Sequence, residues 1–430
     1  MRGRTDVVLD DDPTGVQALH DVPVLLDWSI PRLRRVADAG CSSVHLMTNI
    51  RALSPASACE VTREAATAAR EALPGCRIVL RGDSTLRGHL AEEYRAVRAA
   101  AFPDRAPVLL LVPALPAAGR VTLGGVHWLI TDGTHRPLHA TEYARDGVFA
   151  YRSARLLEWA EERTAGELRA IDGAEVGLQR LRSGGPAAVC EAIIATQASG
   201  RPAACAPDAE TIADLRTIAR GLAMAEARGI DVLVRCAPTF AGVLSGTLAE
   251  GTVALPGTGP RSLLVVCGSY VSGTTRQLEH LRRTHGVDAI EPDVRRLASQ
   301  DPGPEVARVA ELASRRLAQR RIALVATPRT RPDDLTDMDA GQQIARGLAT
   351  IVASVRPHPE ALIAKGGITS HVVLRDGLGA VEARVVGPVA PGVALWEVQT
   401  GGRRIAYLVF PGNVGGPEHL TRVAELAMNG

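Results

Sequence analysis

The segment Val108-Leu-Leu-Leu-Val112 is an uninterrupted apolar run between a charged flank and a proline-rich one. A strand that is buried on both faces of a sheet has this composition, because neither of its sides meets water. Shorter apolar runs precede it, and longer segments with helical spacing lie between them. The runs are 7–9, 22–26, 44–47 and 77–80, and the helical segments are 31–39, 54–73 and 90–101. Strands that alternate with helices predict an α/β fold with a mostly parallel sheet.

The same alternation begins again after the glycine- and proline-rich stretch 250–260. Apolar runs recur at 262–266, 322–326, 361–364 and 405–410, with helical segments between them and a short helix from Pro417. A chain of 430 residues also exceeds the usual size of one hydrophobic core. We therefore expect two α/β domains, residues 1–250 and 262–430, joined by a linker at 251–261, with the active site in the cleft between them.

The overall composition excludes several classes of protein. The chain is 46% hydrophobic and 22% charged with a net charge of +2, and only 3% of its residues are aromatic. So few aromatic side chains argue against nucleic acid as a partner, because single-strand binders stack bases on them. None of the seven cysteines lies in a C-x-x-C spacing, which argues against structural zinc and a disulfide framework.

No segment has the composition of a membrane anchor or a leader. Acidic residues at positions 6 and 10–12 interrupt the first apolar run, and no apolar stretch approaches the ~20 residues of a spanning helix. We expect a cytoplasmic enzyme with small-molecule partners and no membrane partner. Whether it forms a homo-oligomer is left open by the sequence.

Polar residues follow two strands of the first half. One strand runs into Asp10-Asp-Asp-Pro-Thr-Gly15, and another runs into Arg81-Gly-Asp-Ser-Thr-Leu-Arg-Gly88. Ligands of parallel α/β sheets bind at the carboxyl ends of the strands. Three adjacent carboxylates repel one another unless cationic or hydrogen-bonding groups lie beside them. Asp-Pro-Thr-Gly is also ordinary turn chemistry with an aspartate cap, so for this segment both interpretations stay open.

The loop 81–88 combines groups that suit a polyhydroxylated anion. Arginine binds a carboxylate with two parallel hydrogen bonds, and aspartate and serine bind hydroxyl groups. We expect Arg81 and Arg87 to hold the carboxylate of such an anion, and Asp83 and Ser84 to bind its hydroxyls. Asp12, or alternatively Asp11, is expected to act as the general base.

A third polar segment is Thr141-Glu-Tyr-Ala-Arg-Asp146. Glu142 and Arg145 are candidates for contact with the same ligand. Their spacing of three residues is also that of an ordinary ion pair on a helix surface, and this alternative stays open.

Three turns of the second half combine glycine with serine or threonine and precede a helix. They are residues 268–275, 365–370 and 411–416. A strand, such a turn and a helix N-terminus form an anion site, because free N–H groups point at one spot. We expect a nucleotide there, with hydroxyls as donors or Mg²⁺ ligands. The expected contacts are Ser269, Thr274, Gly366, Gly367, Ile368, Thr369, Ser370, Gly412 and Asn413.

Lys365, the only lysine of the chain, precedes the second of these turns. We expect Lys365 to neutralise negative charge on the phosphate group that is transferred from the nucleotide. It comes before the glycines, so the segment does not match the phosphate-binding pattern G-x-x-x-x-G-K-[ST]. No G-x-S-x-G nucleophile elbow and no H-E-x-x-H pattern is present either, and the metal ligands therefore stay unassigned.

Taken together, these motifs resemble the four-carbon acid sugar kinase family. The resemblance runs over nearly the whole chain and rests on six ordered segments that are similar to D-D-x-T-G, K-T-D-S-T-L-R-G, T-E-F-A-R-D, G-S-x-S-x-x-T, G-G-E-T-S and S-G-N-F-G. They are residues 11–15, 81–88, 141–146, 268–274, 366–370 and 411–415. The resemblance implies a sugar-acid-binding N-terminal domain, an ATP-binding C-terminal domain and Mg²⁺.

This chain departs from the family pattern at four positions. Ile368 replaces an acidic residue, Arg81 replaces a lysine, Pro13 replaces an apolar residue and Val271 replaces a serine. We expect transfer of the γ-phosphate of ATP to a hydroxyl of a tetronate or a 3-dehydrotetronate. The alternatives are a non-catalytic sensor of a sugar acid and a nucleotide, and a different α/β enzyme with a phosphate-bearing ligand.

Overall fold

A computed structural model describes residues 4–255, 259–335, 338–412 and 414–429. The chain forms two compact units, and the first consists of Met1–Asp11 and Asp27–Leu248. The second consists of Asp12–Leu26 and Ala249–Gly430. The sequence had assigned residues 12–26 to the first domain, whereas this segment packs with the second unit. Hydrophobic periodicity could not reveal this, because it reports local structure and not which sheet a strand joins.

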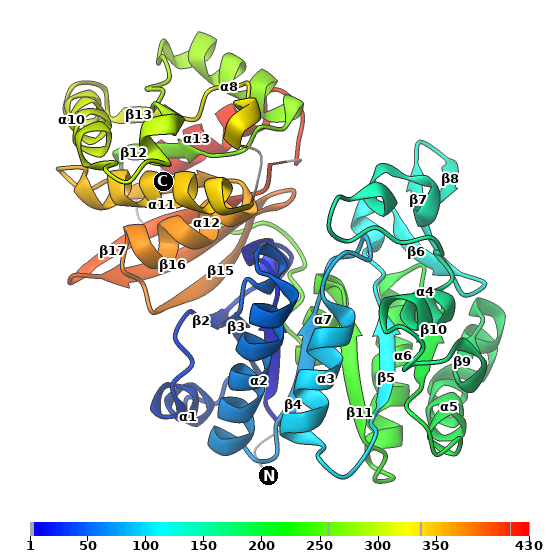
Figure 1. The fold of residues 1–430 in the computed structure, drawn as a ribbon. Helices are drawn as coiled ribbons and strands as arrows, with labels where there is room; N and C mark the ends of the chain where they lie inside the picture. Colours follow the sequence, from blue (N-terminus) through cyan, green and yellow to red (C-terminus); the bar gives the residue numbers. More distant parts are fainter. Residues whose placement is uncertain (1–3, 256–258, 336–337, 413, 430) are drawn as a thin grey trace. The chain divides into compact units, whose positions relative to one another are not determined.

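The first unit contains a parallel sheet with the order β3-β1-β4-β11-β5-β10-β9 among the described residues (Figure 1). The bounds of its strands are Asp6–Asp10 (β1), Ser43–Met47 (β3), Arg77–Arg81 (β4), Val108–Val112 (β5), Ala174–Val176 (β9), Ala204–Pro207 (β10) and Val232–Cys236 (β11). The run at 108–112 is fully buried, as a strand covered on both faces must be. The expected parallel sheet is confirmed.

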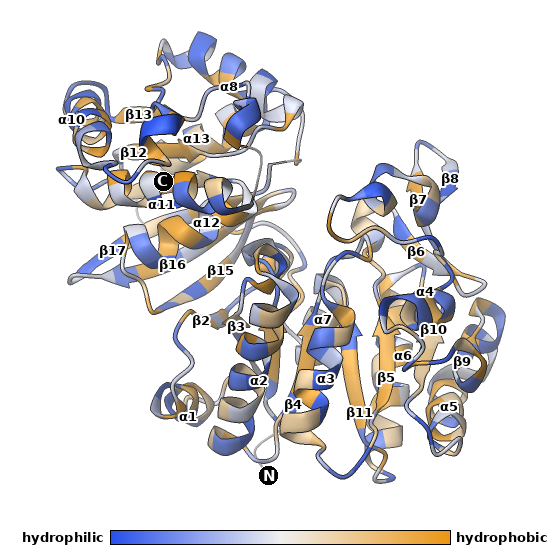
Figure 2. Ribbon diagram, viewed as in Figure 1, coloured by the Kyte–Doolittle hydropathy of each residue, from blue (hydrophilic) through white to orange (hydrophobic). Residues whose placement is uncertain are grey.

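Helices cover both faces of this sheet. They are Ile30–Asp38 (α1), Pro55–Ala72 (α2), Leu90–Ala101 (α3), Leu156–Arg163 (α4), Leu178–Gln197 (α5), Ile212–Glu226 (α6) and Pro238–Ser245 (α7). Residues of α5, α6 and α7 share one core cluster with alternate residues of β5, among them Leu110. The central strand β5 is apolar along its length in Figure 2, whereas β4 and β11 also carry the buried arginines Arg81 and Arg235. Ser54 caps α2 by accepting a hydrogen bond from the Ser57 amide.

A small antiparallel sheet in the first unit was not expected from the sequence. Its strands are Arg120–Leu123 (β6), Val126–Thr131 (β7) and Thr134–Pro137 (β8). The side chain of Asp208, after β10, accepts hydrogen bonds from the amides of Gly124 and Gly125 in the β6–β7 turn at 2.7 and 2.9 Å. This contact fixes the small sheet to the end of the main one.

The second unit contains a mixed sheet. Its strands are Val22–Leu25 (β2), Leu263–Cys267 (β12), Ile322–Ala326 (β13), Ala361–Lys365 (β14), Glu382–Ala390 (β15), Val393–Thr400 (β16) and Arg403–Phe410 (β17). The strands β13-β12-β14-β17 pair in parallel. The strands β17-β16-β15-β2 continue the sheet with antiparallel pairs. The expected two-domain α/β architecture is confirmed, and the antiparallel part is an addition to it.

The helices of the second unit are Ser272–His285 (α8), Val294–Leu297 (α9), Gly303–Arg320 (α10), Met338–Ser354 (α11), Gly367–Val372 (α12) and His419–Asn429 (α13). Leu278 of α8 and Leu420 of α13 belong to one core cluster with the parallel strands. After α12 the chain continues into a π-helical turn, Val373–Gly377.

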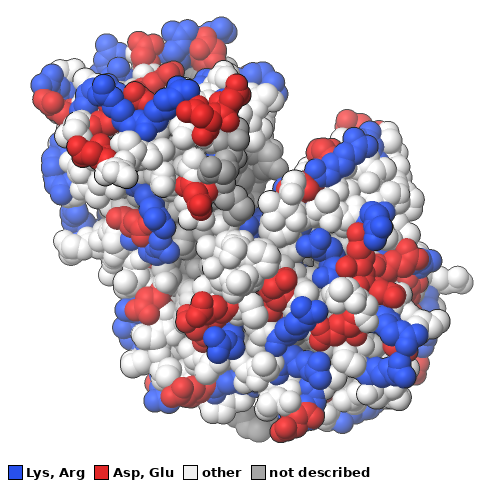
Figure 3. Space-filling view, viewed as in Figure 1, with Lys and Arg blue, Asp and Glu red and all other residues white. Residues whose placement is uncertain are grey.

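The surface carries both signs of charge in a mixed pattern. Lys, Arg, Asp and Glu are interspersed over the face shown in Figure 3, in line with the net charge of +2. Among the described residues, no helix is long and apolar enough to cross a membrane.

Candidate functional site

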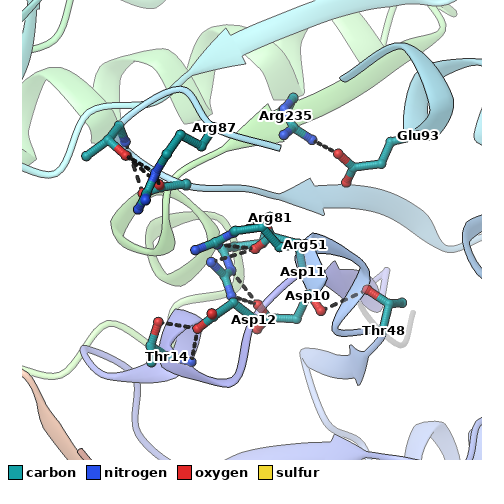
Figure 4. Close-up of polar contacts among 12 residues, drawn as sticks. Asp10, Asp11, Asp12, Thr14, Thr48, Arg51, Arg81, Arg87, Glu93 and Arg235 are labelled. Carbon is teal, nitrogen blue, oxygen red and sulfur yellow. Dashed lines mark hydrogen bonds and ion pairs between the residues drawn. The ribbon is translucent and has the colours of Figure 1, made fainter. Parts of the chain in front are cut away.

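A buried network of charged residues lies at the carboxyl ends of β1 and β4 in the first unit (Figure 4). Asp10, which is fully buried, accepts hydrogen bonds from the His45 Nδ1 at 2.9 Å and from the Arg81 guanidinium. Arg81 also pairs with Asp11, with 2.9 Å between Nη1 and Oδ1. Arg51 donates to both oxygens of Asp11, from Nε at 3.0 Å and from Nη2 at 2.7 Å. The negative charges of Asp10 and Asp11, which would otherwise repel each other, are thus compensated by arginines.

The loop 81–88 is held by its own side chains. Asp83 accepts hydrogen bonds from the Thr85 amide at 3.1 Å and from the Arg87 Nε at 2.7 Å. Burial alone raises the pKa of Asp83, but the guanidinium groups of Arg51 and Arg87 and the bonds from Thr85 lower it well below its usual value. Leu86 has a φ of 67°, which is uncommon for a residue other than glycine. The loop therefore keeps an unusual conformation, and the carboxylate inside it is ionised near neutral pH.

The small sheet β6–β8 supports the same loop from outside. Arg120 donates from Nη1 to the Ser84 hydroxyl at 3.0 Å. The His127 Nε2 lies 3.0 Å from the Ser84 carbonyl oxygen, and its Nδ1 lies 3.0 Å from the Thr122 hydroxyl. Burial lowers the pKa of His127 to about 4, so the ring is neutral near pH 7 and donates from Nε2 to this carbonyl. The Tyr151 hydroxyl donates to the Thr85 carbonyl at 2.9 Å.

The segment 141–146 reaches the loop through other residues than those expected. Glu142 and Arg145 belong to a 3₁₀ turn and are both exposed. Tyr143 and Asp146 are the members that contact Arg87. The Asp146 Oδ2 lies 3.5 Å from its Nη1, and the Tyr143 ring centroid lies 5.5 Å from its Cζ. The sequence could not tell which side of this short turn faces the loop, and contact of Glu142 and Arg145 with a ligand stays a prediction.

The arginines differ in their access to a ligand. The side chain of Arg81 is 2% exposed, whereas those of Arg51 and Arg87 are 18% and 28% exposed. Arg81 is therefore fixed inside the network, and Arg51 and Arg87 keep surface toward solvent. Sequence reasoning missed Arg51, although it follows β3, whose carboxyl end adjoins that of β1. The rule that ligands bind at the carboxyl ends of strands could have found it.

The three glycine turns of the second unit converge, as expected. A Cβ atom placed on Gly268 would lie 2.3 Å from the Thr369 hydroxyl oxygen, and one placed on Gly412 would lie 2.6 Å from the Ser269 hydroxyl oxygen. Thr274 donates from its hydroxyl to the Gly412 carbonyl at 3.0 Å. Each turn thus touches another, and glycine at these positions leaves room for the neighbouring hydroxyl. Such a cluster of small residues and hydroxyls lets a phosphate approach the backbone closely.

Asp12 lies beside the turn at 365–370 of the second unit. A Cβ atom on Gly367 would lie 2.7 Å from the Asp12 Oδ2. Asp12 caps the 3₁₀ turn Pro13–Val16 (η1) by accepting a hydrogen bond from the Thr14 amide at 2.7 Å. The chain passes from the first unit to the second between Asp11 and Asp12. Asp11 and Asp12 are adjacent in the chain, yet Asp11 binds arginines of the first unit and Asp12 lies beside Gly367 of the second.

Lys365 is completely buried at the end of β14. Its Nζ donates to the Pro411 carbonyl at 3.0 Å and lies 3.9 Å from the centroid of the Phe410 ring. Burial lowers the pKa of Lys365 to about 8. The ammonium group lies against the start of the 411–416 turn, and the expected role of Lys365 beside a transferring phosphate stays a prediction.

The remaining candidates of the second unit differ in exposure. Ile368 is 43% exposed, and Thr369 and Ser370 are buried. The Ser370 hydroxyl donates to the carbonyls of Ala364 and Gly366, so it closes the turn. Asn413 lies outside the described residues.

Sequence reasoning missed one further cation near these turns. Arg329, after β13, donates from Nη2 to the Ser269 carbonyl at 2.6 Å and from Nε to the Thr275 hydroxyl at 3.2 Å. It adds positive charge beside the turn at 268–275. Its position after a parallel strand was the available signal.

The described residues contain no group of three or more His, Cys, Asp or Glu side chains arranged to hold a metal ion. A single carboxylate, that of Asp12, lies beside Gly367 in the turn at 365–370 among the contacts described above. Mg²⁺ in nucleotide sites is often held by one or two carboxylates together with the phosphates. One carboxylate near a phosphate-type turn fits that kind of site, and an all-protein metal cage does not.

Comparison with known families identifies two domains in the chain. Residues 7–244 match a sugar-binding N-terminal domain, and residues 264–420 match a nucleotide-binding C-terminal domain. The chain belongs to the four-carbon acid sugar kinase family. The boundaries of the two matches enclose the loop 81–88 in the first domain and the three glycine turns in the second.

Two curated relatives are D-threonate kinases. The one from Salmonella typhimurium is 27% identical over 335 residues, which cover 75% of this chain and 73% of the relative. The one from Cupriavidus necator is 28% identical over 330 residues, which cover 74% and 72%.

Solved structures share the fold. A Haemophilus influenzae protein superposes with a TM-score of 0.67 at 18% identity and covers 98% of this chain and 100% of its own. A Salmonella typhimurium LT2 protein superposes with a TM-score of 0.73, also at 18% identity, and covers 97% and 98%.

Proposed function

We propose that this protein is an ATP-dependent kinase that phosphorylates a hydroxyl of a small sugar acid with four carbons, a tetronate or a 3-dehydrotetronate. The observation that carries the proposal is the convergence of the three glycine turns beside Asp12. This cluster combines close backbone approach, hydroxyl donors and one carboxylate. Phosphoryl transfer needs this kind of positioning more than it needs covalent chemistry. The likeness to D-threonate kinases supports the acceptor class.

In the first unit, Arg51 and Arg87 are the groups proposed to bind the carboxylate of the acceptor, because both keep exposed surface. Arg81 supports them by holding Asp11 in place. Asp83 stays ionised and accepts hydrogen bonds, so it suits acceptor hydroxyls. Ser84 presents a hydroxyl whose orientation Arg120 fixes.

In the second unit, Asp12 is the proposed general base. It is partly exposed, whereas Asp11 is buried and already binds two arginines. The turns around Gly268, Gly366 and Gly412 are proposed to surround the phosphates of the nucleotide. Lys365 contributes by fixing the Pro411 carbonyl, and so the start of the third turn. Mg²⁺ would supply positive charge to the phosphates, and Asp12 is the carboxylate proposed to hold it.

The test is release of ADP from ATP in the presence of a panel of four-carbon sugar acids that begins with D-threonate. Formation of the phosphorylated acid is confirmed by mass spectrometry, in the presence and absence of Mg²⁺. We expect at least one acid to stimulate ADP release and to gain one phosphate. If an acid raises the melting temperature but none stimulates ADP release, the protein is a sensor and the proposal is wrong.

A further inference from the structure

Arg235 is a buried charge below the loop 81–88. It lies near the carboxyl end of β11 and is 5% exposed. Its Nη1 donates to the Oε2 of Glu93, a fully buried residue of α3, and Figure 4 shows the two side chains turned toward each other. Neither residue stands among the acceptor contacts proposed above. Burying such a pair costs free energy of desolvation, which its contacts must offset.

The guanidinium group of Arg235 occupies the space beside two glycines of the loop. A Cβ atom on Gly82 would lie 2.7 Å from the Arg235 Nη2 and 2.9 Å from its Cζ. One on Gly88 would lie 2.9 Å from the same Nη2. Gly88 has a φ of 129° and needs to be glycine for that reason as well, whereas the φ of Gly82 is not positive. At position 82, therefore, the space that Arg235 occupies is the reason for glycine.

Glu93 is the acidic member of this ion pair. Glu93 uses one oxygen to hold Arg235, and its Oε1 has no hydrogen-bond partner among the described residues. Burial raises the pKa of Glu93 to about 7, against the opposing effect of Arg235. A carboxylate with a single partner in such a place holds that partner in one orientation.

We propose that Arg235 is the positioning residue of the acid-binding loop, acting through its contacts with Gly82 and Gly88. This inference rests on the proposed function, because it assigns to the loop the binding of the acceptor. Arg235 is too buried to touch the acceptor itself. It sets where Asp83 and Arg87 stand by filling the space under both ends of the loop. The left-handed conformation of Leu86 shows that the loop needs such support from the surrounding structure.

A double-mutant cycle of Gly82→Ala and Arg235→Lys tests this role. Lysine keeps the charge opposite Glu93 but lacks the planar fork that fills the space beside Gly82. We expect each single variant to raise the KM for the acid by about 10-fold or more, because Gly82→Ala forces packed atoms to shift and Arg235→Lys leaves the space beside Gly82 unfilled. The KM for ATP should stay within about twofold. The double variant should be no worse than Arg235→Lys alone, because lysine leaves room for the new methyl group.

Gly75→Ala is the matched control, since a Cβ atom there would meet nothing within 4 Å. It should change neither KM. Hydrogen exchange of the amides of residues 82–88 gives a second readout, independent of activity, and should be faster in Arg235→Lys. Fold-changes that simply multiply in the double variant, or unchanged exchange of these amides, would overturn the inference.

The failure of the proposed function would look different. In that case the unmodified protein neither binds a four-carbon acid in calorimetry nor phosphorylates one, and the inference fails with it. If the unmodified protein is active and the cycle is additive, only the role of Arg235 is refuted.

Discussion

In the first unit the loop 81–88 is held in place by charged side chains, whereas in the second unit the converging turns are held by glycines and hydroxyl groups. Around the loop, Arg51, Arg81 and Arg87 face the carboxylates of Asp10, Asp11, Asp83 and Asp146. Around the turns, the contacts run between Gly268 and Thr369 and between Gly412 and Ser269.

The difference matches what each proposed ligand requires. A small acid offers one carboxylate and a few hydroxyls, so charged groups in fixed directions are needed to select it. A nucleotide offers several phosphate oxygens, which backbone N–H groups at small residues can bind without adding side chains. Charge networks are sensitive to the loss of one member, and glycine turns are sensitive to added volume. Substitutions and pH changes should therefore affect the two regions differently, and five predictions test this.

The largest effect is expected at Asp12, the proposed general base. Asp12→Asn removes the proposed base but can still accept hydrogen bonds from Thr14. We expect kcat to fall by about 10²- to 10⁴-fold, as for the loss of a general base. Nucleotide affinity, measured by calorimetry, should change little. Asp11→Asn is the contrasting variant, and it should lower the melting temperature because Arg51 and Arg81 each lose a negatively charged partner. Equal kcat losses in both variants would contradict the assignment.

Removing one charge from the loop should affect the acid and not the nucleotide. Arg87→Ala is expected to raise the KM for the acid by about 10- to 100-fold, because hydrogen bonds to charged groups are worth about 1.5–3 kcal/mol. It also leaves Asp83 with one donor fewer. Steady-state kinetics with each substrate varied in turn measures this. A rise confined to the KM for ATP would reverse the roles of the two units.

Adding volume to a turn should have the opposite selectivity. In Gly268→Ala the new methyl group collides with the Thr369 hydroxyl, and we expect the KM for ATP to rise by about 10-fold with that for the acid unchanged. Gly273→Ala is the matched control in the following helix, since a Cβ atom there meets nothing within 4 Å. If both variants behave alike, the turns do not converge on a ligand.

The two units should also respond oppositely to pH. The pKa of Glu93 is raised from 4.5 to about 7, so the folded state keeps this proton longer than the unfolded chain and its stability falls as pH rises from about 4.5 to about 7. The pKa of Lys365 is lowered from 10.5 to about 8, so the unfolded chain keeps that proton longer and stability rises between about pH 8 and 10.5.

Urea unfolding at several pH values measures both slopes. Glu93→Gln should remove the first difference and Lys365→Met the second, each relative to the unmodified protein. A slope that survives its own substitution would show that another group causes it.

The smallest effect is expected at exposed residues that the sequence proposed as ligands. Glu142→Ala and Arg145→Ala should change the KM for the acid by less than about twofold, because surface substitutions away from such contacts usually cost little. Asp146→Ala should have the larger effect, since Asp146 contacts Arg87 and accepts hydrogen bonds from the amides of Val148 and Phe149. The same kinetic assay compares the three. If Glu142→Ala or Arg145→Ala has a larger effect than Asp146→Ala, the original prediction that Glu142 and Arg145 contact the ligand is supported instead.

Local pattern determined much of this protein. The apolar run at 108–112 is the buried strand β5, and the segments 77–80 and 90–101 became β4 and α3. The three glycine turns were recognisable because strand, turn and helix follow one another along the chain. The six family motifs identified the family, since their order is far more specific than any one of them.

Only the tertiary structure decided which of these residues act together. Asp11 and Asp12 are neighbours in the chain, yet one is held by Arg51 and the other lies beside Gly367. Arg235 is far in sequence from the loop it supports, and its strand shows no local sign of the contact. The physical reason is the same in each case. Periodicity and turn chemistry are properties of neighbouring residues, whereas burial, charge pairing and the space beside a glycine depend on segments that meet only when the chain folds.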